Sequence, residues 1–457
     1  MKAALLAGLA GVALALPWAS SAEAQVSPEQ ATELGREAYR YGLPLLEFLR
    51  VRAEMTSVRA PDGRGNAPVN TFSHARGFAR PRDRTVVAPN VDTLYSIAHL
   101  DLAKGPVLLS HPAMGRRFFG FQFLDPYTNV IGYAGTRTTG RGAGRVQIAW
   151  TRRPGKREPG AKLIRSRYRR VWVIGRTLAT DSRADQRRAR AKMLRYRLRP
   201  GPRLRSRRPG RPRKAPLPTD GLELLDALGR ALAQNPPPAR DRPLLERLAG
   251  VGVGPGLRPS EADLSADVLA ALRDGVEREA AEAPTRARAD VARQAIAAGG
   301  WLSLDPKIGN YGTDYDLRAT VALVGLGANT PAEAIYPTAL ADGEGAFLTG
   351  ANRYRLVFGR GEEPPTRAFW SLTMYDSGGY LVPNPTRRYA IGTSHPPLVR
   401  RRDGSIVVLI QRDRPAAGNV NWLPAPAGGF RLNLRLYWPR RAALTGAWRP
   451  PPVQRLG

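Results

Sequence analysis

The feature that most constrains the fold is a change in residue pattern that occurs twice along the chain. Residues 85–175 carry runs rich in aromatic and β-branched residues, such as RRFFGFQFLD and RRVWVIGRT. From about residue 181 to 300, Ala, Leu, Arg and Glu recur at helical spacing, and from residue 310 the β-type runs return with closely spaced turn residues. Short alternating runs are typical of strands, and 3.6-residue spacing is typical of helices. The sequence therefore predicts a mainly β, multidomain α+β protein, in which a helical connector separates two β-rich regions and the second is a sandwich or barrel.

The first residues have the pattern of a signal peptide. Met1 and Lys2 precede the apolar run AALLAGLAGVALALPWA, and small residues stand at Ala22 and Ala24. A membrane anchor is the alternative, but this run is short for a bilayer span of about 20 residues. We therefore expect a mature chain that starts at Gln25, has no transmembrane helix, and is periplasmic or secreted.

The pattern changes also predict the domain boundaries. We expect a signal peptide, an N-terminal helix with a β-rich domain, a helical connector and a C-terminal β domain, at residues 1–24, 25–180, 181–309 and 310–457. Ser27, Pro28 and Gln30 form a helix-start signal with a capping box. Within the connector, residues 236–238 (Pro-Pro-Pro) and 254–256 (Gly-Pro-Gly) favour several short helices over one long helix.

The positive charge is concentrated in one part of the chain. The formal net charge is +33, and residues 141–220 alone hold 27 Lys and Arg against 4 Asp and Glu. Within this part, residues 197–218 are rich in Arg and Pro and poor in apolar residues, so we predict an exposed mobile loop. Residues Arg197–Lys214 would attract an anionic envelope surface, or they are a solvated loop without a partner. The segment 207–214 is similar to an AT-hook, but an exported protein does not meet chromosomal DNA, so nucleic acid is not a favoured partner.

Several classes of chemistry have no support in the sequence. The chain lacks cysteine, which excludes disulfides, thiolate metal sites and a cysteine nucleophile. Its four histidines show no HExxH or paired spacing, and there is no Walker loop, Rossmann fingerprint or Gly-x-Ser-x-Gly elbow. The sequence therefore predicts no metal site, and it assigns neither a cofactor nor an oligomeric state.

Motifs in both β-rich regions resemble two domains of unknown function. Residues 90–96 (NVDTLYS), 100–102 (LDL), 125–129 (DPYTN) and 135–140 (GTRTTG) resemble the N-terminal domain of unknown function 1254. The C-terminal region is similar to its usual companion, the domain of unknown function 1214, in the segments 352–354, 364–365, 369–376, 384–389, 403–405, 421–426 and 435–439. The resemblance implies an N-terminal β-rich domain, helical insertions and a C-terminal jelly-roll-like sandwich, in an exported bacterial protein. It implies no settled reaction.

The chain departs from the family pattern in one segment. The family usually continues from residues 135–140 into a Gly-Pro-Gly-Trp loop, whereas residues 148–155 here read IAWTRRPG. If that loop forms part of a pocket, residues 145–155 would alter or remove it.

The first group of candidate residues lies around Asp92. We predict Asp92 as a general acid or base with His74 and Tyr95 as catalytic partners, and Asn90 as a substrate-binding residue. Tyr127 and Arg137, in the matching segments, are further predicted substrate-binding residues. Strand alternation places Asp92 and Tyr95 on opposite faces unless the strand starts after Asp92. The alternative is structural: Asn90 and Asp92 bind loop backbone and Tyr95 packs in the core.

The second group consists of aromatic, amide and charged residues in the C-terminal region. The members predicted to bind substrate are Trp370, Asp376, Asn384, Arg388, Asn421 and Trp422. Aromatic rings supply flat apolar area and an arginine supplies a two-donor fork, which together suit a polar ring or a carboxylate. The alternative is again structural, with Trp370 in the core of a strand, Asp376 in a hairpin turn and Asn421 capping a loop.

Two functions remain open from these residues. One is an exported hydrolase or lyase that acts on a polar small molecule or an envelope polymer. The other is a noncatalytic envelope protein that binds a glycan or an acidic ligand and has a basic surface loop.

Overall fold

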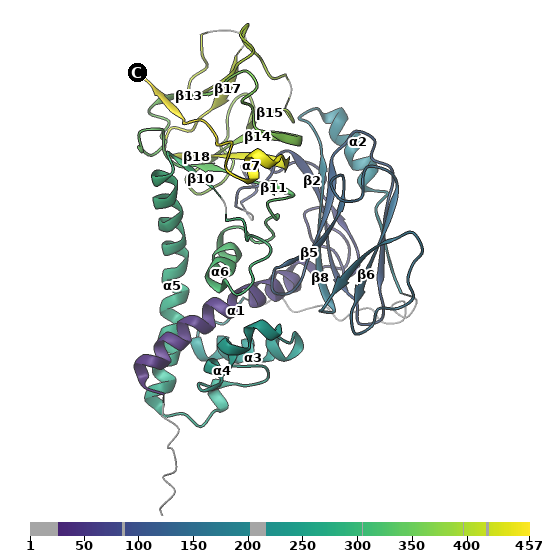
Figure 1. Cartoon of the computed structure of the whole chain (residues 1–457), viewed down its shortest axis with the longest axis vertical. Helices are drawn as coiled ribbons and strands as arrows, with labels where there is room; N and C mark the ends of the chain where they lie inside the picture. The colour runs from purple at the N-terminus through teal and green to yellow at the C-terminus, as the bar shows by residue number, and fades with distance from the viewer. Residues whose placement is uncertain (1–25, 85–86, 202–215, 304, 396, 417–419) are drawn as a thin grey trace, which may run out of the picture.

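The computed structural model describes residues 26–84, 87–201, 216–303, 305–395, 397–416 and 420–457. Two β-rich units and a helical region are arranged around the two longest helices, α1 (Pro28–Thr56) and α5 (Ala266–Ala297). In Figure 1, α5 rises from the helical region to the C-terminal β unit, and α1 crosses it and runs towards the N-terminal β unit. This β-rich α+β architecture with helical insertions confirms the predicted fold class.

The N-terminal unit consists of two sheets that enclose one core. The first sheet has the order β1-β2-β8-β4-β5 and the second has the order β7-β6-β3-β9. The strands of the first sheet are Ser73–His74, Thr93–Asp101, Arg170–Leu178, Phe119–Leu124 and Val130–Gly135, and those of the second are Lys162–Ser166, Gly144–Trp150, Val107–His111 and Arg197–Pro200, each in sheet order. Leu100, Phe121 and Val173 of the first sheet pack with Leu109 and Ile148 of the second.

The N-terminal unit extends further along the chain than predicted. Helix α2 (Arg183–Met193) buries Ala189 and Met193 in the core of this unit, and β9 (Arg197–Pro200) pairs with β3. Residues 183–200 thus belong to the N-terminal unit rather than to the helical connector. Residues 197–200 are a paired strand and not the predicted mobile loop, because their backbone completes the edge of the second sheet. Of the rest of the predicted loop, residues 202–215 lie outside the described residues, as does the predicted signal peptide.

The C-terminal unit is a sandwich. One sheet has the order β10-β12-β18-β14-β15, with β11 also paired to β18, and the other has the order β17-β16-β13-β19. The strands of the first sheet are Trp301–Leu302, Thr338–Ala339, Phe430–Pro439, Thr366–Asp376 and Ala390–Gly392, with β11 at Ala334–Ile335; those of the second are Asn421–Pro424, Ile406–Gln411, Arg353–Phe358 and Gln454–Leu456. Trp370, Leu372 and Leu434 face Leu356 and Val408 in the core between the sheets.

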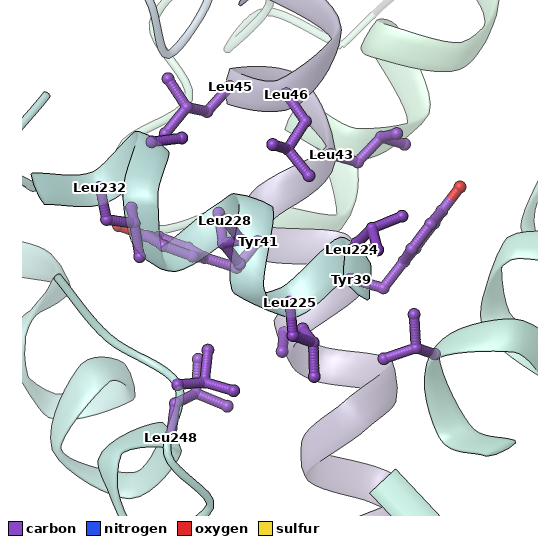
Figure 2. Packing of buried hydrophobic residues seen from close by; sticks show 14 of the residues in the cluster. Tyr39, Tyr41, Leu43, Leu45, Leu46, Leu224, Leu225, Leu228, Leu232 and Leu248 are labelled. Atoms are coloured by element: carbon purple, nitrogen blue, oxygen red, sulfur yellow. The ribbon is translucent and has the colours of Figure 1, made fainter. Parts of the chain in front are cut away.

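The helical region packs against α1. It contains α3 (Gly221–Gln234), α4 (Arg242–Ala249) and α6 (Tyr315–Val324), besides α5, while the short α7 (Arg441–Leu444) follows β18. Short 3-10 turns lie at Ala239–Asp241 and Pro259–Glu261. Figure 2 shows the leucines of α3, among them Leu228 and Leu232, beside Tyr41 and Leu45 of α1. Ala319 of α6 belongs to the same core.

Local sequence signals explain the start of α1 and its close crossing with α5. The Ser27 side chain accepts a hydrogen bond from the Gln30 backbone N–H and the Gln30 side chain accepts one from Ser27 N–H, which confirms the predicted capping box. A Cβ atom on Gly275 would lie 2.1 Å from the Thr32 carbonyl oxygen, so this position of α5 admits no side chain. The connector separates at its Pro and Gly segments as predicted, but α5 is a single helix of 32 residues that continues through Pro284.

Candidate functional site

The candidate site lies where the first sheet of the N-terminal unit meets the C-terminal sandwich. Its first element is the turn that precedes β2. The Asn90 Oδ1 accepts hydrogen bonds from the backbone N–H of Asp92 (2.5 Å) and of Thr93 (3.1 Å). The Asn90 Nδ2 donates to the Tyr437 hydroxyl at 2.6 Å, which ties the turn to β18. Because β2 begins at Thr93, Asp92 lies before the strand. The alternation of side chains between the two faces of the strand therefore does not apply to Asp92.

Asp92 is fully buried and is held by three residues of the C-terminal unit. Its Oδ1 accepts from the Ser394 hydroxyl at 2.7 Å and lies 2.9 Å from His395 Nε2, while its Oδ2 accepts from the Ser371 hydroxyl at 2.9 Å. Burial would raise the pKa of Asp92, but the His395 and Ser394 hydrogen bonds and the nearby His395 and Arg435 charges hold it below its ordinary value. The site thus contains a buried, ionised carboxylate whose orientation is fixed.

His395 links this buried carboxylate to an exposed one. Its Nδ1 lies 2.8 Å from Asp181 Oδ2; the His395 side chain is 3% exposed, whereas that of Asp181 is 61% exposed. Burial alone would lower the pKa of His395, but hydrogen bonds to Asp181 and Asp92, together with the charges of both carboxylates, raise it to about 9. At neutral pH the ring is therefore an imidazolium that donates one N–H to each carboxylate.

A polar hollow opens beside His395. Its volume is about 310 Å³ including its open mouth, and it is lined by Asp181, Arg388, Ala390, Ile391, His395, Pro397 and Asn421. Arg388 Nη1 donates to the Trp422 carbonyl oxygen at 3.2 Å. The side chain of Asn421 bonds the backbone of Val399 through both its oxygen and its nitrogen, which fixes the wall of the hollow. The hollow offers a proton donor, a carboxylate and a guanidinium group to a polar ligand.

A second hollow, too tight to admit a water molecule, surrounds Arg176. Arg176 is buried, and it donates to Gln122 Oε1 at 2.7 Å, Asn329 Oδ1 at 3.1 Å and the Gly327 carbonyl oxygen at 3.1 Å. Its guanidinium carbon lies 5.5 Å from the centre of the Tyr95 ring. This arrangement holds a buried cation by neutral oxygens and an aromatic ring.

The structure does not bring the first group of predicted residues together, and none of them lines either hollow. Asp92 contacts His395, while Tyr95 lies by Arg176, so the two do not share one hollow. The Arg137 Nε donates to Glu333 Oε2 at 2.5 Å, and Glu333 lines the Arg176 hollow. His74, the partner predicted for Asp92, instead has its Nδ1 2.8 Å from the Ser96 hydroxyl.

Tyr127 lies apart from both hollows, in the helical core. Its hydroxyl donates to the Asn235 carbonyl oxygen at 2.7 Å, and its ring lies 5.4 Å from that of Tyr168. Its position matches a packing role in this core.

Of the second group, the structure brings Arg388 and Asn421 to the His395 hollow. Trp370 is buried in the sandwich core, with its ring centre 5.3 Å from that of Phe358. Asp376 closes a tight turn by accepting from Tyr380 N–H, and Asn384 organises a turn by bonding the backbone of Arg388. The Trp422 ring nitrogen donates to the Gln411 carbonyl oxygen.

His395, Asp181, Ser371 and Ser394 were not among the predicted site residues. Asp92 and His395 are separated by 303 residues, and neither lies in a spaced motif that links them. Ser371 does lie in the FWSLTMYD segment that carries the family resemblance, so its position in that motif could have marked it as a candidate site residue. Residues 145–155, where the chain departs from the family, form most of β6 and the exposed turn after it, and they line neither hollow.

The described residues contain no group of three or more His, Asp and Glu side chains placed to hold a metal ion. In the same ranges, no helix is both long and apolar enough to cross a membrane.

The fold and the site together define a β-rich protein of two units whose candidate site forms at their interface. Residues 69–200 match a family model described as Protein of unknown function (DUF1254), and residues 333–441 match one described as Protein of unknown function (DUF1214). The chain therefore belongs to the proteins that combine a DUF1254 domain with a DUF1214 domain.

The chain matches several solved structures, including one from Vibrio parahaemolyticus and one from Burkholderia cenocepacia. The crystal structure of the VPA0106 protein from Vibrio parahaemolyticus has a TM-score of 0.67 and 22% identity, with 93% of this chain and 100% of that chain covered. A putative uncharacterized protein from Burkholderia cenocepacia has a TM-score of 0.42 and 14% identity, with 94% of this chain and 92% of that chain covered. The first likeness supports the fold. No protein with curated annotation matches the chain.

Proposed function

We propose that the protein is a hydrolase or lyase that acts on a polar small molecule, with His395 as its general acid and base. The observation that carries the proposal is the Asp92–His395–Asp181 chain at the edge of a polar hollow. A buried carboxylate fixes one ring nitrogen, and the other nitrogen points to an exposed carboxylate that can move aside. This is the arrangement that an acid–base histidine requires.

The residues of the hollow suggest how a reaction would proceed. A substrate that displaces the Asp181 carboxylate meets the Nδ1–H of the imidazolium, which donates its proton to the departing oxygen. As the C–O bond to that oxygen breaks, either a water molecule adds to the carbon or a C=C bond forms, and the neutral imidazole accepts the proton that the water or the neighbouring carbon loses. Throughout, Asp92 positions the ring and stabilises its charged form, and Arg388 can hold a carboxylate of the substrate through its two-donor fork.

A kinetic experiment tests this proposal. Wild-type protein is assayed against a panel of polar esters, lactones, glycosides and hydroxy acids, with products followed by NMR. His395→Gln should lower turnover of any active compound by about 100-fold or more, because general acid–base catalysis contributes on this order. The matched control is Asp263→Asn, which removes an exposed carboxylate outside the hollow and should leave turnover unchanged.

A smaller change completes the test. Asp181→Asn should keep the protein folded and shift the pH profile of turnover, because the partner of His395 Nδ1 has changed. Full turnover in a folded His395→Gln protein would refute the role of His395.

The basic outer surface of the N-terminal unit favours a second candidate function, noncatalytic attachment to an anionic envelope surface. Arg183, Arg187 and Arg188 are exposed on α2, and Arg197 and Arg199 are exposed on β9. Such a surface attracts acidic polymers and anionic lipids through charge. Binding to vesicles of phosphatidylglycerol that disappears at high salt, without turnover of any compound, would support this alternative.

Both candidates include export to the periplasm or the medium. The support for export is the charged start, apolar run and small residues of segment 1–24. Fractionation of cells that produce the full chain, followed by sequencing of the mature N-terminus, tests it; a mature chain starting at Gln25 in the periplasm is the expected result.

A further inference from the structure

Three arginines gather at the end of the first N-terminal sheet that lies away from the Arg176 hollow. Arg52 comes from the last turns of α1, Arg169 directly precedes β8, and Arg170 begins β8 opposite Asp101 at the end of β2. Asp101 lies six positions after Tyr95 in β2, which is a distance of roughly 20 Å along a strand. The arginine cluster, defined as Arg52, Arg169 and Arg170, is therefore distinct from both hollows.

The arginine cluster has more positive charge than its ion pairs neutralise. Asp101 Oδ2 lies 3.0 Å from Arg169 Nη2 and 3.8 Å from Arg52 Nη2. Arg170 instead donates to the neutral side-chain oxygens of Gln234, at 2.9 Å, and of Asn235, at 3.4 Å. Within the described parts of the chain, Asp101 is the one carboxylate that pairs with these three groups.

Two N–H groups of the arginine cluster, and two of the neighbouring His99 and Trp172 rings on β2 and β8, have no acceptor among the described residues. They are the Nε–H groups of Arg52 and Arg169, the indole N–H of Trp172 and the ring N–H of His99. Burial, followed by the charge of Arg52, holds the pKa of His99 well below its ordinary value, so the ring is neutral and carries one N–H. A buried donor without an acceptor destabilises the folded protein.

The donors belong to neighbouring side chains. His99 and Trp172 face each other across β2 and β8, and their rings are stacked with centres 5.3 Å apart. Phe48 of α1 meets the His99 ring edge-on, one helical turn before Arg52. The side chain of Arg52 is 13% exposed and that of Arg169 is 42% exposed, so the cluster is closed at α1 and open to solvent at Arg169.

We propose that the arginine cluster binds a small oxyanion of the phosphate type. Such an ion supplies both of the things that the cluster lacks, negative charge and hydrogen-bond acceptors. A guanidinium group binds a pair of phosphate oxygens through two parallel hydrogen bonds. An anion bound between several guanidinium groups also reduces the repulsion among them.

Calorimetric titration of the full chain tests the proposal. Inorganic phosphate is the probe, with chloride used to keep the ionic strength constant, and separate titrations use glycerol phosphate and acetate. We expect one saturable site for phosphate. Tight binding of glycerol phosphate as well would identify the ligand as the phosphate group of a larger molecule, whereas preference for acetate would contradict the tetrahedral oxyanion.

Three variants and one matched control locate the site. Arg52→Met keeps the aliphatic stem and should weaken phosphate binding by about tenfold or more, the effect of losing one hydrogen bond to a charged group. Arg230→Met removes the same charge from an exposed position on α3 and should leave binding unchanged. Asp101→Asn should tighten binding, because it removes the competing carboxylate and keeps an oxygen for the Ala103 N–H. Arg388→Met, in the His395 hollow, should have no effect.

Three results would overturn the proposal. The first is phosphate binding no stronger than chloride binding, in which case water satisfies the four donors. The second is an equal loss in Arg52→Met and Arg230→Met, which would indicate general attraction to a basic protein. The third is a loss in Arg388→Met with Asp101→Asn unchanged, which would place the anion beside His395. Asp101→Asn keeps the test decisive even if Arg52→Met fails to fold.

Discussion

The pKa of His395 provides a direct test of the site. The rise from 6.5 to about 9 means that folding favours the imidazolium by roughly 3 kcal/mol. Because the pKa is higher in the folded protein than in the unfolded chain, this stabilisation is complete below pH 6.5 and is lost as the pH rises through about 9. We expect the free energy of unfolding to fall over this interval in wild type, and the fall to be absent in His395→Gln.

The two carboxylates should contribute unequally. Asp92 is fully buried, so its charge acts on His395 through a medium of low dielectric constant, whereas the Asp181 carboxylate is largely exposed and screened by water. Asp181→Asn should therefore lower the pKa of His395 modestly and leave it above 7, since exposed ion pairs contribute about 0.2–1 kcal/mol. Asp92→Asn should lower the pKa of His395 below 6.5, because only the screened charge of Asp181 then opposes the effect of burial.

Nitrogen-15 NMR of the histidine rings measures these values. The pKa values of the other three histidines in the chain, His74, His99 and His111, are all lowered, chiefly by burial. We therefore expect the ring signal of one histidine to titrate near pH 9, well above the other three, and Asp263→Asn should not move it. No histidine titrating above pH 7.5, or an unchanged signal in Asp92→Asn, would refute the reasoning.

Further predictions concern stability and are measured by denaturant or thermal unfolding. Ser27→Ala should cost about 1 kcal/mol, because the cap of α1 is lost. Gly275→Ala should cost about 1–3 kcal/mol by forcing α1 and α5 apart, whereas Gly428→Ala, where the new methyl group meets open space, should be nearly neutral; equal effects would contradict the packing argument. Arg117→Met should cost about 2 kcal/mol at pH 7, because Arg117 donates to Asp185 at 2.6 and 3.0 Å. Since this contact lowers the pKa of Asp185, its stabilisation is present above the ordinary pKa and is lost in acid, so the variant and wild type should converge as the pH falls below 4.

The sequence could predict the parts of the fold that depend on neighbouring residues. The capping box at Ser27 and Gln30 acts over three residues, and the aromatic and β-branched residues that mark β4 and β8 lie within the strands themselves. The breaks at residues 236–238 and 254–256 are likewise local. The length of α5 was not predictable in this way, because its Pro284 is a helix-breaking signal that packing along α1 and α6 overrides.

Which strands form the two sheets of the N-terminal unit depended on pairing between segments that are far apart in the sequence. Composition marked residues 197–200 as part of an Arg- and Pro-rich loop, and β3 pairs with them almost 90 residues away in sequence. An edge strand needs backbone hydrogen bonds more than apolar side chains, so its composition carries little signal.

The sequence alone therefore determined the order of β-rich and helical regions, the start of α1, the excess of positive charge and the resemblance to the two domains. It also identified Asp92, Arg388 and Asn421 as candidate site residues. Only the tertiary structure decided that Asp92 meets His395 rather than His74, and that unpaired donors gather around Arg52. The reason is physical: a strand or a cap is specified by residues a few positions apart, whereas the partner of a buried charge is whichever group the folded chain places beside it.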